Sequence, residues 1–270
     1  MGFGLSVLQR LGRGALLWCL ACLGVLAPGW SACAGSLPGE LPTLVGRLNA
    51  MSGSVQWWDR DGGGWRSAEG GALSNWPVAT GDRLRTGPDG RAELRIGSTT
   101  LRLGAGVELG LQQLDEQAVV LQLQDGSLAL RLAAVGADAF GPVELRTREG
   151  RWLPRRPGSY RFDRERDATQ ASVWRGELQF EGHDSALTIP EGRRADLWLD
   201  SPDSSRRAAT RYAWANIQRD SFADWVARDE RQDDAPISAQ YVPPGVTGWQ
   251  DLDRNGDWIA DTDEGPLWLP

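Results

Sequence analysis

The chain has 270 residues and a formal net charge of −7 at pH 7, with 41% hydrophobic and 24% charged residues. This composition is typical of a globular protein, and the acidic balance disfavours nucleic acid as a partner. The 34 Gly and 15 Pro, against 5 Phe and 2 Met, favour many turns between short strands over long helices. The 14 Trp supply large amphipathic side chains that suit either packing or contact with sugars, peptides and membrane interfaces.

The N-terminal segment 1–34 has the layout of a secretory signal peptide. Its basic residues end at Arg13, an apolar run spans 15–26, and the helix breakers Pro28 and Gly29 follow. The run is short for a membrane span. The small residues Ala32 and Ala34, which follow the run, predict cleavage after Ala34. We therefore expect a periplasmic or secreted protein of a Gram-negative envelope, with no transmembrane segment after signal removal.

All cysteines precede that cleavage point, at positions 19, 22 and 33. We therefore expect a mature protein without disulfides and without a cofactor. An alternative remains open, because Ser31, Ala32 and Cys33 resemble the end of a bacterial lipobox, in which Cys33 becomes a lipid anchor. Trp30 stands where that motif usually has Leu.

Residues 44–199 alternate between apolar and polar side chains and are interrupted by Gly, which is the pattern of half-buried strands. The segment predicts an all-β domain, an antiparallel β-sandwich or a jelly roll. Within 119–132, Asp125 and Gly126 predict a two-residue hairpin turn that places six aliphatic residues on one face. Residues 123–130 and 173–180 share one apolar and glycine pattern, which we interpret as paired hairpins of a single sandwich or jelly roll.

The composition changes after this domain. Residues 200–234 predict a linker followed by one short amphipathic helix, with Ser221 as its N-cap and Asp224 completing a capping box. Residues 235–270 are rich in Pro, Gly, Asp and Trp and predict an extended tail that does not fold independently. A surface formed by Trp249, Trp258 and Trp268 is the candidate binding surface, provided that these side chains are displayed and not packed.

The sequence does not point to an enzyme. A Ser or Cys nucleophile needs a neighbouring base, and the chain has a single histidine, His183, in a segment that predicts a turn. A glycosidase needs a pair of carboxylates, and no pair among the 36 acidic residues stands out by its spacing or by apolar surroundings.

A calcium loop is the main candidate metal site. Oxygen-bearing side chains recur at alternate positions, with Gly256 at the sixth position. The twelfth position holds Thr262 where a calcium loop has a bidentate Glu, so the expected outcome is no metal. The candidate ligands would be Asp251, Asp253, Asn255, Asp257, Asp261 and Asp263.

Several short motifs occur in one order along residues 44–198. They are VGRL (45–48), TGDRLRT (80–86), GRAELRIGST (90–99), DGSL (125–128), RPGSYRF (156–162), RGEL (175–178) and EGRRA (191–195). Together they resemble the FecR-type domain family. The segment 248–270 further resembles secreted proteobacterial FecR-domain proteins that continue into a Trp/Tyr/Pro-rich region.

The resemblance implies a β-rich periplasmic or secreted module without catalytic residues. We therefore expect a non-catalytic envelope protein with a FecR-like domain at 44–199 that binds an envelope protein or glycan or has a structural role. The alternative is a periplasmic signalling component related to FecR anti-sigma regulators. Only 14 residues precede the apolar run, too few for the sigma-binding domain of those regulators.

Overall fold

The computed structural model describes residues 45–59, 63–68, 75–133, 141–200, 208–233, 237–243, 246–260, 262–263 and 265–270. The predicted signal peptide, the lipobox residue Cys33, residues 201–207 of the predicted linker and Asp261 lie outside these ranges. Within them, no helix combines the length and the apolar character that a membrane span requires.

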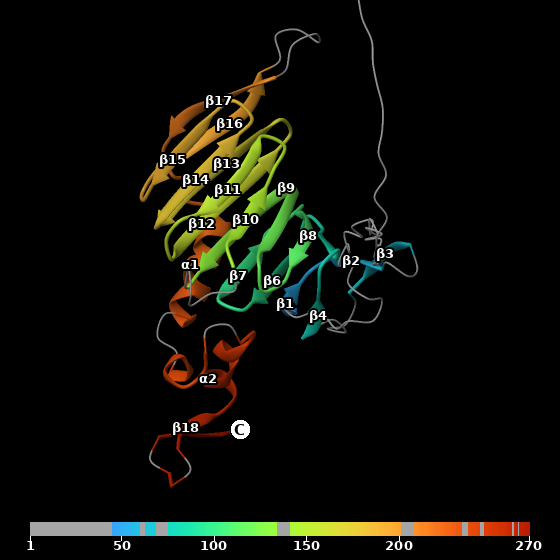
Figure 1. Ribbon diagram of the computed structural model, residues 1–270. Helices are drawn as coiled ribbons and strands as arrows, with labels where there is room; N and C mark the ends of the chain where they lie inside the picture. The colour runs from blue at the N-terminus through green and yellow to red at the C-terminus, as the bar shows by residue number, and fades with distance from the viewer. Residues whose placement is uncertain are drawn as a thin grey trace, which may run out of the picture. The chain divides into compact units, whose positions relative to one another are not determined.

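The described chain is mostly β-structure, and its first seventeen strands form two sheets that share strand β9 (Figure 1). Sheet A has the order β4 (Trp76–Val78), β1 (Gly46–Ser52), β6 (Arg91–Ile96), β7 (Thr99–Leu103), β9 (Val119–Leu132), β12 (Gly158–Glu165), β13 (Ala168–Arg175), β16 (Arg194–Asp200) and β17 (Ala209–Ala215). Sheet B has the order β3 (Gly64–Ser67), β2 (Val55–Asp59), β5 (Arg83–Thr86), β8 (Glu108–Leu114), β9, β10 (Val143–Arg146), β11 (Gly150–Pro154), β14 (Glu177–Gly182) and β15 (Ala186–Pro190). The all-β sandwich predicted from the alternating pattern is confirmed.

The pairing is antiparallel throughout these sheets except between β9 and β10, which run parallel. From β10 onward, consecutive strands form antiparallel pairs that belong alternately to sheet B and sheet A. The pairs are β10 and β11, β12 and β13, β14 and β15, and β16 and β17. Both similar segments, 123–130 and 173–180, contain a point where the chain passes from one sheet to the other. Their common glycine therefore marks a crossing between sheets.

The predicted hairpin at Asp125 and Gly126 is wrong, because β9 is one strand of 14 residues. Its first half pairs with β8 and β10 in sheet B, and its second half pairs with β7 and β12 in sheet A. Gly126 has φ 88°, and a Cβ there would lie 2.6 Å from the backbone of Val107. The glycine thus allows the strand to bend from one sheet into the other. In the sequence, a glycine that allows such a bend cannot be told from a glycine that forms a hairpin turn.

The six aliphatic residues of this strand are all buried between the sheets, as the pattern predicts. They are Val119, Leu121, Leu123, Leu128, Leu130 and Leu132. Trp152 of sheet B lies at the centre of the same core, with its ring centroid 5.6 Å from that of Phe162 in sheet A and 4.6 Å from that of Phe180. Its indole nitrogen donates to Thr147 Oγ1 at 3.0 Å, which satisfies the one polar group of this buried ring.

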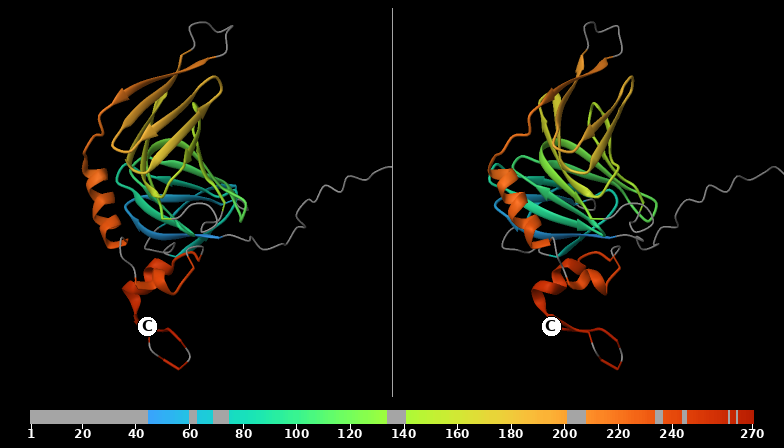
Figure 2. Two further views of the ribbon diagram at one scale, coloured as in Figure 1. Left: turned by 60° about the vertical axis from the view of Figure 1, so that its left-hand side comes forward. Right: turned by 90° about the vertical axis from the view of Figure 1, so that its left-hand side faces the viewer.

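Helix α1 (Ser221–Asp233) confirms the predicted amphipathic helix and packs on the outer face of sheet A (Figure 2). Phe222 and Val226 form a buried cluster with Ala129 of β9. A Cβ on Gly104 would lie 2.9 Å from the Phe222 ring, so the close approach of helix and sheet requires glycine there. Between the predicted domain end and this helix, the structure adds strand β17, which the sequence pattern did not predict.

The N-cap of α1 is Asp220 and not Ser221. The Ala223 amide donates to Asp220 Oδ1 at 2.8 Å, which is the usual bond between a cap side chain and the third helical residue. Asp and Ser are comparably good caps. Asp220 differs from Ser221 in a second contact, because its carboxylate also accepts from Arg161 of sheet A.

The C-terminal segment contains short folded elements where an extended tail was predicted. These are η2 (Ile237–Gln240), η3 (Trp249–Asp251), α2 (Leu252–Asn255), and the two-stranded sheet of β18 (Asp257–Ile259) and β19 (Leu267–Leu269). Thr247 connects this segment to sheet A, because its Oγ1 accepts from the Gly97 amide at 3.0 Å and donates to the Val45 carbonyl at 3.1 Å.

Candidate binding cleft

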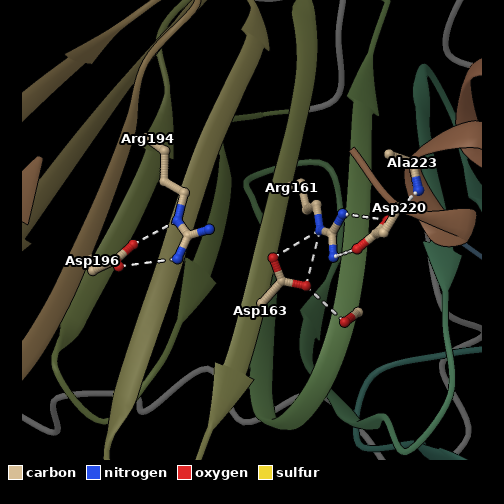
Figure 3. A network of polar contacts seen from close by, with 7 residues as sticks. Arg161, Asp163, Arg194, Asp196, Asp220 and Ala223 are labelled. Carbon is tan, nitrogen blue, oxygen red and sulfur yellow. Dashed lines mark hydrogen bonds and ion pairs between the residues drawn. The ribbon is translucent and has the colours of Figure 1, made fainter. Parts of the chain in front are cut away.

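The start of α1 is held on sheet A by a network centred on Arg161 of β12 (Figure 3). Its guanidinium donates from Nη1 and Nη2 to the two carboxylate oxygens of Asp220, at 2.9 and 2.7 Å. Its Nε donates to Asp163 at 2.8 Å, and Ser127 Oγ donates to the same carboxylate at 2.7 Å. The bidentate geometry fixes both the position and the orientation of the helix start.

The charges of this network stabilise one another. Hydrogen bonding to Arg161 is the main cause of the lowered pKa of Asp220. Burial alone would lower the pKa of Arg161, but its hydrogen bonds to Asp220 and Asp163 outweigh burial and raise that pKa. Both groups therefore stay charged through the neutral range.

A second network of buried charges lies on the same face of sheet A. Arg95 and Arg102 are almost completely buried, and both contact Glu93, at 2.8 and 3.1 Å. Asp251 of the C-terminal segment pairs with Arg95 at 3.1 Å and also with Arg47. Acidic residues that follow the β-domain thus neutralise arginines of the sheet, which explains how these charges tolerate burial.

A cleft of about 740 Å³ opens between α1, strand β13 and the connection from β17 to α1. Trp174 and Arg175 come from β13, Arg219 comes from the connection, and Glu230 and Arg231 come from α1. The remaining lining residues are Ser159, Gly192, Ile217, Gln218, Ala223, Asp224, Val226 and Ala227. Its size and its mixture of apolar and polar groups are typical of small-molecule sites.

The polar groups at the base of this cleft are already arranged. Glu230 is buried, its Oε1 accepts from Ser159 Oγ at 2.5 Å, and its Oε2 lies 3.7 Å from Arg175 Nη2. The backbone carbonyl of Glu230 accepts from Arg131 Nη1 at 3.0 Å. These contacts hold the second half of α1 against the sheet.

Two other surfaces carry aromatic side chains. On sheet B, the Trp58 and Trp65 ring centroids are 5.5 Å apart, and the Arg85 guanidinium lies 4.1 Å above the Trp65 ring. On β17, Tyr212 and Trp214 are exposed, with the Arg193 guanidinium 4.9 Å from the Trp214 ring. Arginines of the chain itself already cover part of both surfaces, so neither is as well formed a site as the cleft.

The three tail tryptophans proposed as a binding surface do not form one displayed face. Trp249 is 7% exposed. Trp258 is half-buried, its ring lies 4.6 Å from that of Tyr241, and its Nε1 donates to Ser238 Oγ at 2.7 Å. Trp268 pairs with Trp258 across the small sheet and donates to the Leu252 carbonyl at 3.2 Å.

Three of the six calcium candidates are engaged in separate contacts. Asp251 pairs with arginines, Asp253 accepts from the Ser238 amide at 3.0 Å, and the Asn255 amide group donates to the Asp251 carbonyl at 2.8 Å. Asp257 and Asp263 are exposed. Across the described ranges, no group of three or more His, Cys, Asp or Glu is placed to hold a metal ion.

Sequence reasoning missed the residues of the cleft. Trp174 lies inside the repeated pattern at 173–180, but the pattern itself gives no reason to select its tryptophan. Arg219 and Arg231 show no motif in sequence, because they share a cleft with Trp174 only when α1 packs on sheet A. His183, the one histidine, lies in an exposed turn after β14 and does not line the cleft.

No protein-family model matches the chain, and no curated protein matches it. Two solved structures, each described as a candidate anti-sigma factor from Parabacteroides distasonis ATCC 8503, are similar to it. One has a TM-score of 0.40 and 10% identity, and the match covers 69% of this chain and 97% of the other. The second has a TM-score of 0.35 and 12% identity, with 71% and 96% covered.

Proposed function

We propose that this chain is a non-catalytic, exported ligand-binding module of the cell envelope, and that its site is the cleft between α1 and sheet A. The observation that carries the proposal is the cleft itself, about 740 Å³ with Trp174, three arginines and two carboxylates on its walls. Sites of this size usually combine an apolar wall with a few fixed polar groups.

The non-catalytic part of the proposal rests on the residues available. The only histidine lies away from the cleft. Of the two carboxylates in the cleft, Glu230 is bound by Ser159 and Arg175, and Asp224 is exposed. Glycoside hydrolysis needs two carboxylates that flank the bond to be cleaved, and the contacts of Glu230 with Ser159 and Arg175 already occupy one of the two carboxylates of the cleft.

The export part rests on the leader at 1–34, and the FecR-type resemblance supports the same compartment. Mass spectrometry of the mature N-terminus in a Gram-negative host is the direct test. A chain that starts at Gly35 is expected. An acylated Cys33 would instead place the protein on a membrane surface, and an uncleaved leader would contradict export.

Binding is tested by calorimetry of the purified protein against a panel of envelope saccharides and peptides. Trp174→Ala should abolish the binding heat of any ligand found, because it removes the aromatic wall of the cleft. Trp198→Ala is the matched control, since Trp198 is exposed on β16 and does not line the cleft. Equal loss in both variants, or no ligand at all, would reject the cleft. Chemical turnover of a bound saccharide would reject the non-catalytic role.

A further inference from the structure

Two arginines of the cleft differ from the arginines around them. Arg219 and Arg231 are exposed and line the cleft, and within the described ranges neither has an ion-pair partner. Nearby, Arg161 is bound by Asp220 and Asp163, and Arg175 faces Glu230. Their positive charges are therefore not neutralised within the cleft, although the chain has a net charge of −7. They make this part of the surface attractive to an anion.

Arginine also determines the kind of anion. Its planar guanidinium presents several donors in a fixed fork that fits the two oxygens of a carboxylate or the oxygens of a phosphate or sulfate group. Arg219 comes from the connection before α1 and Arg231 from the last turn of α1. Because a helix rises about 1.5 Å per residue, the two arginines lie near opposite ends of α1 and would contact two separate acidic groups of one ligand.

The rest of the lining favours a hydroxylated ligand over an acidic peptide. Ser159, Gln218, Asp224 and Glu230 offer hydrogen-bond acceptors. Sugar hydroxyl groups can donate to these oxygens and also accept from the arginines. A run of Asp or Glu side chains can only accept, and it would meet repulsion from Asp224 and Glu230. Trp174 adds an aromatic surface of the kind on which apolar faces of rings pack.

We infer that the cleft binds an anionic saccharide that carries more than one acidic group, with one group at Arg219, another at Arg231 and a sugar ring against Trp174. This inference rests on the proposed function and adds the ligand class to it. Carboxylate-bearing and sulfate-bearing sugars share the required chemistry, and the experiment separates them.

The experiment is calorimetry of the full chain with trigalacturonic acid, with the neutral analogue galactotriose, and with a sulfated disaccharide of heparin. We expect trigalacturonic acid to bind at least about tenfold more tightly than galactotriose, and its affinity to fall as salt is raised. Arg219→Gln and Arg231→Gln should each weaken its binding by about tenfold, which corresponds to the loss of one charge-assisted hydrogen bond.

Arg228→Gln is the matched control. Arg228 is also exposed and lies on α1, but it does not line the cleft. Its variant should bind trigalacturonic acid like the parent. If the heparin disaccharide binds more tightly than trigalacturonic acid and loses this affinity in Arg219→Gln and Arg231→Gln, the ligand is still an anionic saccharide, and its acidic groups are sulfates.

Three results would overturn the inference. If galactotriose and trigalacturonic acid bind with equal affinity and both lose binding in Trp174→Ala, the proposed function stands, but the site does not prefer an anionic sugar. Tight binding of a hexaglutamate peptide and not of the sugars would replace the saccharide with an acidic protein segment. No binding of these probes or of any other panel ligand would remove both the inference and the proposed function.

Discussion

Arg161 of β12 and Asp220 at the start of α1 form a bidentate ion pair, with nitrogen-to-oxygen distances of 2.9 and 2.7 Å. The same Asp220 carboxylate caps the helix through the Ala223 amide. One side chain therefore both starts the helix and attaches it to the sheet. The cleft depends on this contact, because α1 forms one of its walls.

Asp220→Ala should lower the free energy of unfolding by about 2 kcal/mol, since it removes a helix cap and leaves Arg161 without its bidentate partner. Equilibrium urea unfolding measures this change. Asp167→Ala is the control, because Asp167 pairs only with Arg148 and both side chains are largely exposed. Equal stability of the two variants would show that Asp220 does not anchor the helix.

Stability should decrease in acid. The pKa values of Asp220 and Glu93 are lowered from ordinary values of 3.8 and 4.5. For Glu93 the penalty of burial is outweighed by the charges of Arg95 and Arg102. A carboxylate with a lowered pKa in the folded state adds stability above its unfolded pKa, and that stability is lost as the pH falls through the folded pKa.

The midpoint of urea unfolding should therefore be constant from neutral pH down to about pH 5 and decrease below that value. Asp220→Asn should show a smaller decrease than the parent chain, because it lacks one of the carboxylates whose pKa is lowered. A parent and variant with identical pH profiles would contradict the contribution of Asp220.

Glu93→Gln should be strongly destabilising, by about 3–5 kcal/mol, because it removes the carboxylate shared by two buried arginines. Thermal and urea unfolding both report the loss. Glu165→Gln, at the exposed end of β12, should change stability by less than about 0.5 kcal/mol. A Glu93→Gln variant as stable as the parent would mean that other groups neutralise the charges of Arg95 and Arg102.

Gly126→Ala tests the bend in β9 against Gly106→Ala. Both glycines have positive φ, 88° and 69°, but an added Cβ meets the Val107 backbone only at Gly126 and open space at Gly106. The left-handed backbone alone costs an alanine about 1–2 kcal/mol. Gly106→Ala should show that loss, and Gly126→Ala should exceed it by about 1–3 kcal/mol because the strand must move. Equal losses by urea unfolding would argue that β9 adapts without strain.

Much of the fold was predictable from local pattern. Alternation of apolar and polar residues over 44–199 predicts strands, and all six aliphatic residues of 119–132 are buried as expected. The helix at α1 follows from the spacing of Phe222, Trp225 and Val226. These features depend on which side of a strand or helix each residue faces, and that periodicity is present in the sequence itself.

The sequence by itself determined that strands dominate, where the short helix lies, and that one histidine and no cysteine follow the leader. Only the tertiary structure decided that Gly126 bends a strand, that Asp220 caps α1 through its contact with Arg161, and that Arg219 and Arg231 share one cleft with Trp174. The reason is physical. Periodicity reports the burial of each residue along its own element, whereas a site is formed by residues distant in sequence that meet only when the helix packs on the sheet.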